Sequence, residues 1–523
     1  MRKLTIIGIL AVFLSMAAFS QPADTEIASI TDHNDWGWTS VVQTNGIITL
    51  ATVPDIGARI MQYDLGDHDF LYMNPFEIGK TYTPSRGGFH GYGGYVVWPG
   101  PQNSRWGWPP PPTLDYGPYD SEIVHESADS TSVFVSSDVE QWQAPGLRFE
   151  RKMTMYKGTS RVRVDQAMIN ESSTEQSWSI WDVTQTPGNT PRDDFWVYFP
   201  INPNSEINEE GVYFRNNQQN SEAWQGEVAP GIYGAVFRPD GEKLFADPDN
   251  GWIAYVDEGE SKAYIKTFKV FEGETYPGDN GYGRVQIYLG GANFEVEVAS
   301  PIADMEADGG RYSFFQEWYA TTINGPILAV NRAGAIERRL RQNAQTQNIE
   351  GTFGVFHVGT AKLVAKDASG AILAEGAVQN ITPLAKLYIN ESLELPAGTA
   401  TVEVVVYDYT GQEVGAINSE TLEQLTSVKT QNTVLPKSSS LLQNYPNPFN
   451  PTTKIDYVLS KSGYVELSVF NLNGQMVKTL VNRTQSAGSH SVLFDGSNLC
   501  SGIYLCHMKT EDADIIQRML LFK

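Results

Sequence analysis

Residues 87–120 read GGFHGYGGYVVWPGPQNSRWGWPPPPTLDYGPYD. Tryptophans and tyrosines alternate here with glycines, and four consecutive prolines follow Trp108. Because proline has no backbone donor, this composition excludes a helix and leaves few donors for a strand ladder. A segment this apolar is costly to leave in water, so we expect a long, ordered loop that lies across the end of a β-scaffold and walls a pocket.

The side chains of this loop indicate a ligand of mixed polarity. Trp98, Trp106 and Trp108 stand beside polar residues such as Gln102 and Asp115. Flat aromatic rings can stack on the apolar CH faces of a sugar, while amide and carboxylate groups bond its hydroxyls. Alternatively, the tryptophans only plug the end of the scaffold. Composition leaves both interpretations open.

Short alternating runs flank the loop on both sides. Examples are IITLATV, ARIMQYDL, LRFERKMTMY, SRVRVDQAMIN and NFEVEVAS. Between residues 47 and 326 no apolar period of 3.6 residues persists over the length of a helix, whereas period two recurs throughout. The sequence therefore predicts one large all-β unit built from two stacked sheets.

Composition restricts the partners and the compartment. The formal net charge of −24, from 37 basic and 61 acidic residues, makes nucleic acid a poor partner. Residues 1–20 combine a basic start with an apolar run and predict a signal peptide. No later stretch reaches the roughly 18 apolar residues of a membrane helix, so we expect no transmembrane segment in the mature chain. Cys500 and Cys506 either form a disulfide or stay unpaired.

Motifs spread along the large unit resemble those of one known family. In chain order they are PDIGARI at 54–60, Gly-Gly at 93–94, WPGPQ at 98–102, Arg151 with Asn170, EVE at 295–297 before Ser-Pro, and Glu317 with Trp318. This order is similar to that of the galactose mutarotase-like supersandwich proteins, over residues 30–341. The resemblance implies a supersandwich fold and a role connected with sugars.

The resemblance also directs attention to groups that transfer protons. Mutarotases pair a histidine acid with a glutamate base, because opening a sugar ring needs one proton delivered and another removed. Here the corresponding strand, 181–185, reads WDVTQ and has no histidine. The candidate catalytic residues are therefore Glu297, His90 and Tyr119. Glu295 and Glu297 share one strand face by period two, and such a pair can act as acid and base or can simply face solvent.

The candidate substrate-binding residues extend beyond the aromatic loop. An arginine fork such as that of Arg151 suits a uronate carboxylate, although strand arginines commonly lie on the surface. The full set is Trp98, Gln102, Trp106, Trp108, Arg151, Trp181, Gln185, Glu295 and Glu317. We expect no cofactor and no catalytic metal. The Asp-Asn-Gly stretches at 247–251 and 278–281 fit either a structural calcium ion or ordinary turns.

Smaller units are expected beyond residue 341. Alternating runs at 349–425 predict an Ig-like β-sandwich spacer, and the serine-rich stretch 426–440 predicts a linker. Residues 444–453 read NYPNPFNPTT. They open a unit at 441–523 that closely resembles the Ig-like C-terminal sorting domain of type IX secretion substrates. The resemblance implies the type IX secretion machinery as a partner. It also implies a secreted or outer-surface location, reached after processing of the signal peptide and the sorting domain.

Together these features favour a secreted or cell-surface carbohydrate-binding protein on a mutarotase-like scaffold. One alternative is a sugar epimerase or a polysaccharide lyase that uses a glutamate, histidine or tyrosine for proton transfer. Another is a structural surface protein without a ligand. The sequence does not decide whether the protein is an enzyme.

Overall fold

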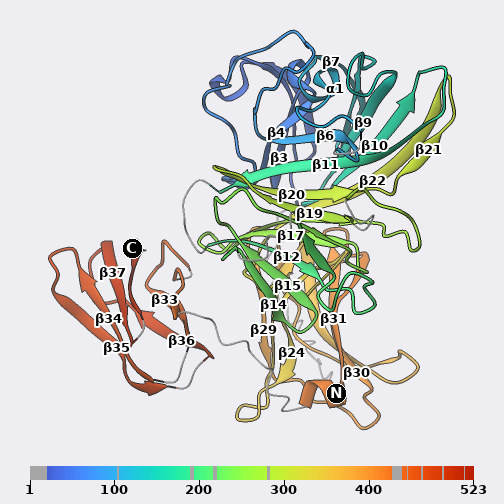
Figure 1. The fold of residues 1–523 in the computed structure, drawn as a ribbon. Helices are drawn as coiled ribbons and strands as arrows, with labels where there is room; N and C mark the ends of the chain where they lie inside the picture. The colour runs from blue at the N-terminus through green and yellow to red at the C-terminus, as the bar shows by residue number, and fades with distance from the viewer. Residues whose placement is uncertain are drawn as a thin grey trace, which may run out of the picture.

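The computed structural model describes residues 21–523 apart from 103–104, 189–193, 216–220, 279–282, 427–438, 445, 461–462, 486–487 and 512. This part of the chain folds into three β-sandwiches in sequence order, one large and two small (Figure 1). The all-β prediction is thereby confirmed. The predicted signal peptide at 1–20 and most of the predicted linker at 426–440 lie outside the described residues.

One layer of the large sandwich is a twelve-stranded antiparallel sheet. Its main path runs β1 (Glu26–Thr31), β2 (Thr39–Thr44), β3 (Ile48–Val53), β4 (Arg59–Leu65), β6 (Tyr95–Gly100), β11 (Gln176–Pro187), β20 (Asn293–Ala299), β19 (Val285–Leu289), β16 (Lys243–Ala246), β13 (Val212–Phe214). Two short strands lie off this path, since β5 (His68–Asp69) pairs with β4 and β21 (Ala303–Met305) pairs with β11.

The second layer is a ten-stranded antiparallel sheet. Its order is β14 (Trp224–Ala229), β15 (Ile232–Val236), β12 (Phe195–Pro200), β17 (Trp252–Asp257), β18 (Lys262–Phe268), β22 (Gly310–Thr322), β10 (Val162–Asn170), β9 (Leu147–Tyr156), β8 (Ser130–Ser137), β7 (Tyr119–Glu126). Three short helical turns complete this unit: η1 (His33–Asp35), η2 (Pro54–Ile56) and α1 (Pro112–Asp115).

Side chains alternate between the interior of the large sandwich and its two outer faces. On β11, Ile180 joins the core between the sheets, whereas Trp181 packs in a separate cluster on the other side of its sheet. At the centre of the core, Trp318 of β22 makes edge-to-face contacts with Tyr63 of β4 and Tyr95 of β6, with ring centroids 5.6 and 4.7 Å apart. These contacts join the two layers, because β22 belongs to one sheet and β4 and β6 to the other.

The aromatic stretch 87–120 differs from its prediction in two places. Residues Tyr95–Gly100 form the buried strand β6 in the interior of the sheet, and α1 forms one helical turn. The expectation of a loop was wrong for β6, and the exclusion of a helix was wrong for α1, because a single turn needs few donors and Pro112 at its first position loses none. The entry to β6 requires glycine, since Gly94 has a φ of 69° and a Cβ there would lie 2.4 Å from the Ile60 carbonyl oxygen.

The second sandwich contains two sheets and a short helix. The strands are β23 (Ala329–Asn331), β24 (Gly334–Gln342), β25 (Ile349–Val355) and β29 (Lys386–Glu391) in one sheet, and β27 (Ile372–Glu375), β26 (Gly359–Lys366), β28 (Gln379–Ile381), β30 (Thr401–Asp408) and β31 (Glu413–Thr421) in the other. Helix α2 (Leu422–Thr426) follows. Because β24 pairs with β25, this sandwich includes residues before 341, where the sequence had suggested the boundary.

The large and second sandwiches share a hydrophobic core. Phe356, which follows β25, stacks on Tyr319 of β22 with ring centroids 4.2 Å apart. Its carbonyl oxygen accepts a hydrogen bond from Thr159 Oγ1 at 2.7 Å. The second sandwich is therefore packed against the ten-stranded sheet and lies at the bottom of the view in Figure 1.

The C-terminal sandwich has a core of its own. Its strands are β32 (Ser440–Leu441), β33 (Thr452–Leu459) and β36 (Gly488–Asp495) in one sheet, and β35 (Met476–Gln485), β34 (Gly463–Asn471), β37 (Gly502–Lys509) and β38 (Asp514–Leu521) in the other. The hairpin turn between β34 and β35 has Gly474 at a φ of 75°. Both thiols are free, Cys500 on the surface and Cys506 buried in β37.

Candidate functional site

Eight side chains gather on the outer face of the twelve-stranded sheet. Cross-strand pairing places Trp98 of β6 opposite Trp181 of β11, and Gln185 of β11 opposite Glu295 of β20. We call the set the tryptophan–glutamate cluster; its members are Trp98, Trp106, Trp108, Trp181, Gln185, Lys243, Glu295 and Glu297. All of these residues except Lys243 were predicted from the sequence.

The four tryptophans form a continuous aromatic surface. Trp98 lies edge-on to Trp181 with ring centroids 5.3 Å apart, and Trp106 stacks on Trp181 at 6.4 Å. Trp98 is buried, Trp106 is half-buried, and Trp108 is 61 % exposed. The exposure of the rings therefore increases from the buried Trp98 to Trp108, whose ring a ligand can reach.

The aromatic loop holds these rings through its own polar contacts. Trp106 Nε1 donates to the Pro99 carbonyl oxygen at 2.7 Å, and the Gln102 carbonyl oxygen accepts from the backbone N–H groups of Arg105, Trp106 and Gly107. Gln102 therefore shapes the turn that carries Trp106. Asn103 lies outside the described residues.

Trp98 is anchored from behind by a buried ion pair. Its Nε1 donates to Asp115 Oδ1 at 2.8 Å, and the same oxygen accepts a hydrogen bond from Arg59 Nη2. Because Asp115 ends α1, this contact ties the short helix to β6. The proline-rich segment is thus fixed against the sheet.

Glu297 is fully buried and has strong partners. Trp181 Nε1 donates to its Oε2 at 2.7 Å, and Lys243 Nζ donates to Oε1 and Oε2 at 3.0 and 2.8 Å. The same ammonium lies 4.6 Å from the centroid of the Trp181 ring. A buried carboxylate needs such charge compensation, so Lys243 and Glu297 act as one unit.

Glu295 is the more accessible carboxyl group of the cluster, with 8 % of its surface exposed. Its Oε1 accepts hydrogen bonds from Gln185 Nε2 at 2.7 Å and Asn293 Nδ2 at 3.2 Å. Burial, together with the neighbouring charge of Glu297, raises the pKa of Glu295 to about 7, against the lowering effects of Gln185 and Lys243. Glu295 can therefore hold or release a proton near neutral pH.

A third buried ion pair fixes β20 from inside the large sandwich. Lys266 Nζ of β18 donates to Asp182 Oδ1 of β11 at 2.7 Å and to the Val296 carbonyl oxygen at 2.9 Å. Asp182 Oδ1 also accepts from the Val298 backbone N–H at 2.8 Å. The two backbone contacts lie on either side of Glu297, so this pair determines where that residue sits.

Besides Gln102, four predicted site residues lie outside the cluster. Arg151 points into the core, where its Nη2 donates to the Gly57 carbonyl oxygen and its guanidinium faces the Tyr119 ring at 5.3 Å. Tyr119 is buried and donates to the Leu114 carbonyl oxygen at 2.9 Å, and burial raises the pKa of Tyr119 to about 12. Neither residue is placed to contact a ligand on the outer face.

The other two predicted residues, His90 and Glu317, also lie away from the cluster. His90 stacks on Tyr82 with ring centroids 3.5 Å apart, within the aromatic loop. Glu317 belongs to the ten-stranded sheet, where Arg161 and Tyr319 donate to its carboxylate. We therefore leave His90, Tyr119, Arg151 and Glu317 out of the candidate site.

The turns considered for calcium have protein partners where they are described. Asp247 Oδ2 accepts from Ser205 Oγ at 3.1 Å and from Asn202 Nδ2 at 3.3 Å. Residues 279–281 of the second turn lie outside the described part of the chain. Among the described residues no group of three or more histidine, cysteine or acidic side chains is arranged to hold a metal ion.

Comparison with solved structures finds fold similarity at low identity. A putative aldose 1-epimerase from Klebsiella pneumoniae is 8% identical with a TM-score of 0.39, covering 56% of this chain and 83% of that one. Galactose mutarotase-like proteins from Clostridium acetobutylicum and Lactobacillus casei are 9% and 10% identical, each with a TM-score of 0.36. They cover 58% and 54% of this chain and 99% of their own. No curated protein matches the chain.

The C-terminal sandwich has a family match of its own. Residues 443–521 match the family described as the secretion system C-terminal sorting domain. The predicted sorting domain is confirmed, and with it handling by the type IX secretion machinery and a secreted or outer-surface location. None of the helices in the described ranges has the length and apolarity to span a membrane.

This assignment predicts the effect of deleting residues 441–523. We expect the deleted chain to fold, because the large and second sandwiches have cores that do not use the C-terminal one, but to fail to reach the cell surface. Cell fractionation and circular dichroism of the truncated chain check both parts. Normal surface delivery of the truncated chain would contradict the sorting assignment.

Proposed function

We propose that the protein binds carbohydrate at the tryptophan–glutamate cluster. The observation that carries this proposal is the meeting of four tryptophan rings with Gln185 and Glu295 on one sheet face. Aromatic rings stack on the CH faces of a sugar, and amide and carboxyl groups at their edge can bond its hydroxyls. The exposed ring of Trp108 supplies the outermost stacking surface.

Replacing Trp108 by alanine tests this proposal. A glycan array identifies a bound sugar, and calorimetry then compares the variant with the parent chain. We expect binding to weaken by about 1–3 kcal/mol, as for an aromatic anchor, with an unchanged melting temperature because the ring is exposed. Tyr464→Ala in the C-terminal sandwich removes a similarly exposed ring and should leave binding unchanged. A Trp108→Ala variant with normal affinity would remove this ring from the site, and absence of binding to any glycan would favour a structural surface protein.

A second candidate function is proton transfer on a bound sugar, as in a sugar epimerase or a polysaccharide lyase. The observation in its favour is the neighbouring pair of carboxyl groups on β20 with unequal surroundings. Glu297 accepts hydrogen bonds from Lys243 and Trp181, whereas Glu295 has amide partners, and burial raises the pKa of Glu295 to about 7. Under this candidate Glu295 delivers the proton that a histidine delivers in mutarotases.

Turnover by a Glu295→Gln variant tests this candidate. We expect a rate about 10²–10⁴-fold below that of the parent chain, because the amide cannot donate an acidic proton. An acid must be protonated to act, so the parent chain's activity should be present below pH 7 and lost as the pH rises through about 7. Glu317→Gln on the other sheet is the matched control and should keep the full rate. Full activity of Glu295→Gln would exclude Glu295 as the acid.

A further inference from the structure

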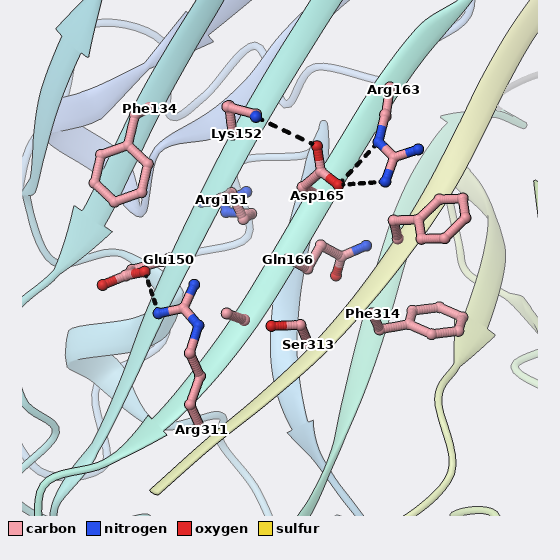
Figure 2. Close-up of a pocket in the computed structure, with 12 residues that line it drawn as sticks. Phe134, Glu150, Arg151, Lys152, Arg163, Asp165, Gln166, Arg311, Ser313 and Phe314 are labelled. Carbon is pink, nitrogen blue, oxygen red and sulfur yellow. Dashed lines mark hydrogen bonds and ion pairs between the residues drawn. The ribbon is translucent and has the colours of Figure 1, made fainter. Parts of the chain in front are cut away.

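The outer face of the ten-stranded sheet is hollowed by two adjoining cavities, of about 360 and 550 Å³. Lys152, Arg163 and Asp165 line both of them. The cavities therefore form one elongated depression across β7, β8, β9, β10 and β22, which we call the arginine groove. Figure 2 shows its first part, with Glu150 and Arg311 at one end. Tyr156 and Ser132 line the other end.

Strand register explains the depression. On β10, Ala167 is paired with Glu150 of β9 on one side and with Ser313 of β22 on the other. A small side chain thus forms the floor, while Phe134 and Phe315 line the groove beside it. The depression therefore results from a small side chain that lies between large ones on the outer face of the sheet.

The groove carries more positive than negative charge. Three cations, Lys152, Arg163 and Arg311, reach it together with two carboxylates, Glu150 and Asp165. In the chain as a whole acidic residues outnumber basic ones by 61 to 37. Because screening confines the field of a surface charge to about 8–10 Å at moderate salt, the local excess decides what approaches this face.

The cations keep donors available for a ligand. Arg311 is 50 % exposed, and its ion pair with Glu150 joins Nη1 to Oε2 at 2.6 Å. A guanidinium has five N–H donors, so one such contact leaves a fork that matches a carboxylate or a sulfate. Arg163 directs Nε and Nη2 to Asp165 Oδ1, both at 2.9 Å, so Nη1 is the nitrogen left for a ligand; its guanidinium also covers the Phe315 ring, 4.0 Å from the centroid. Phe315 itself is partly exposed and offers an apolar face to a sugar ring.

We propose that the arginine groove binds a linear anionic polysaccharide, with its carboxylate or sulfate groups on Arg311, Lys152 and Arg163. The elongated shape suits several linked sugars, and the excess of cations selects an acidic chain over a neutral one. This site lies on the opposite sheet from the tryptophan–glutamate cluster and does not depend on the function proposed for that cluster.

Calorimetry on the mature chain tests the proposal with four polymers: polygalacturonate, chondroitin sulfate, the neutral glucan pullulan and single-stranded DNA. We expect an acidic polysaccharide to bind, more weakly at high salt, and pullulan and DNA not to bind. Binding of polygalacturonate identifies a carboxylate ligand, whereas binding of chondroitin sulfate alone identifies the sulfate, because that polymer also carries uronate carboxylates. Arg311→Gln with Lys152→Gln should weaken binding at least about tenfold, since two charge-assisted contacts are lost.

Two further variants sharpen the test. Glu150→Gln removes a competing carboxylate, so it should strengthen binding. Arg341→Gln in the second sandwich removes an arginine that is 57 % exposed and has one ion pair, with Glu350, and it should change nothing. The proposal is overturned if neither acidic polymer binds, if pullulan or DNA binds as tightly, or if the double variant keeps the parent affinity.

Discussion

Replacing Lys266 by methionine is expected to lower the free energy of unfolding by about 3–5 kcal/mol, because Asp182 then remains buried without its charge partner. Both side chains are fully buried and their charged atoms lie 2.7 Å apart. Lys266 comes from the ten-stranded sheet and Asp182 from the twelve-stranded sheet. The substitution therefore weakens the contact between the two layers. Urea unfolding of the mature chain, followed by tryptophan fluorescence, measures the change.

A second variant separates the lost charge balance from lost packing. Adding Asp182→Asn to Lys266→Met removes the unpaired charge while keeping an acceptor for the Val298 backbone N–H. We expect the double variant to regain a substantial part of the lost stability. A single variant as stable as the parent, or a double variant no more stable than the single one, would contradict this account of the ion pair.

Replacing Trp98 by alanine is expected to cost about 3–5 kcal/mol of stability, in contrast to the small effect of Trp108→Ala. Trp98 is 5 % exposed, packs on Trp181 and donates to Asp115. Its removal leaves a cavity and takes a donor from a buried carboxylate. Denaturant unfolding of Trp98→Ala and Trp98→Phe measures the effect.

The phenylalanine variant retains most of the packing and loses only the indole donor. It should therefore cost less than half as much as the alanine variant. If Trp98→Ala were as stable as the parent chain, Trp98 would be a free platform for ligand instead of part of the support beneath it.

Strand alternation made much of the large sandwich predictable. The shared face of Glu295 and Glu297 follows from period two, and the structure places both on the outer face of β20. The same rule of period two also predicts the orientation of Arg151. In the run LRFERKMTMY it is in phase with Phe149 and Met153, so it belongs with the inward-facing side chains.

Strand order across the sheet was not predictable in this way. Lys243 pairs with a carboxylate 54 residues later in the chain, because β19 lies between β16 and β20. No local pattern in the KLFA run indicates this neighbour. The strand β6 was missed for another reason, since Pro99 and the prolines after the strand suggested a loop, while the register of β6 with β11 made it part of the ladder.

The shared core between the large and second sandwiches has a consequence for the orientation of the two proposed binding faces. Phe356 lies against Tyr319, so the second sandwich is set at a defined angle to both outer sheet faces. Helix α2, at the end of the second sandwich, is therefore a fixed reference point for those faces. If the chain is attached through the end of the second sandwich, both outer sheet faces keep a constant orientation relative to the point of attachment.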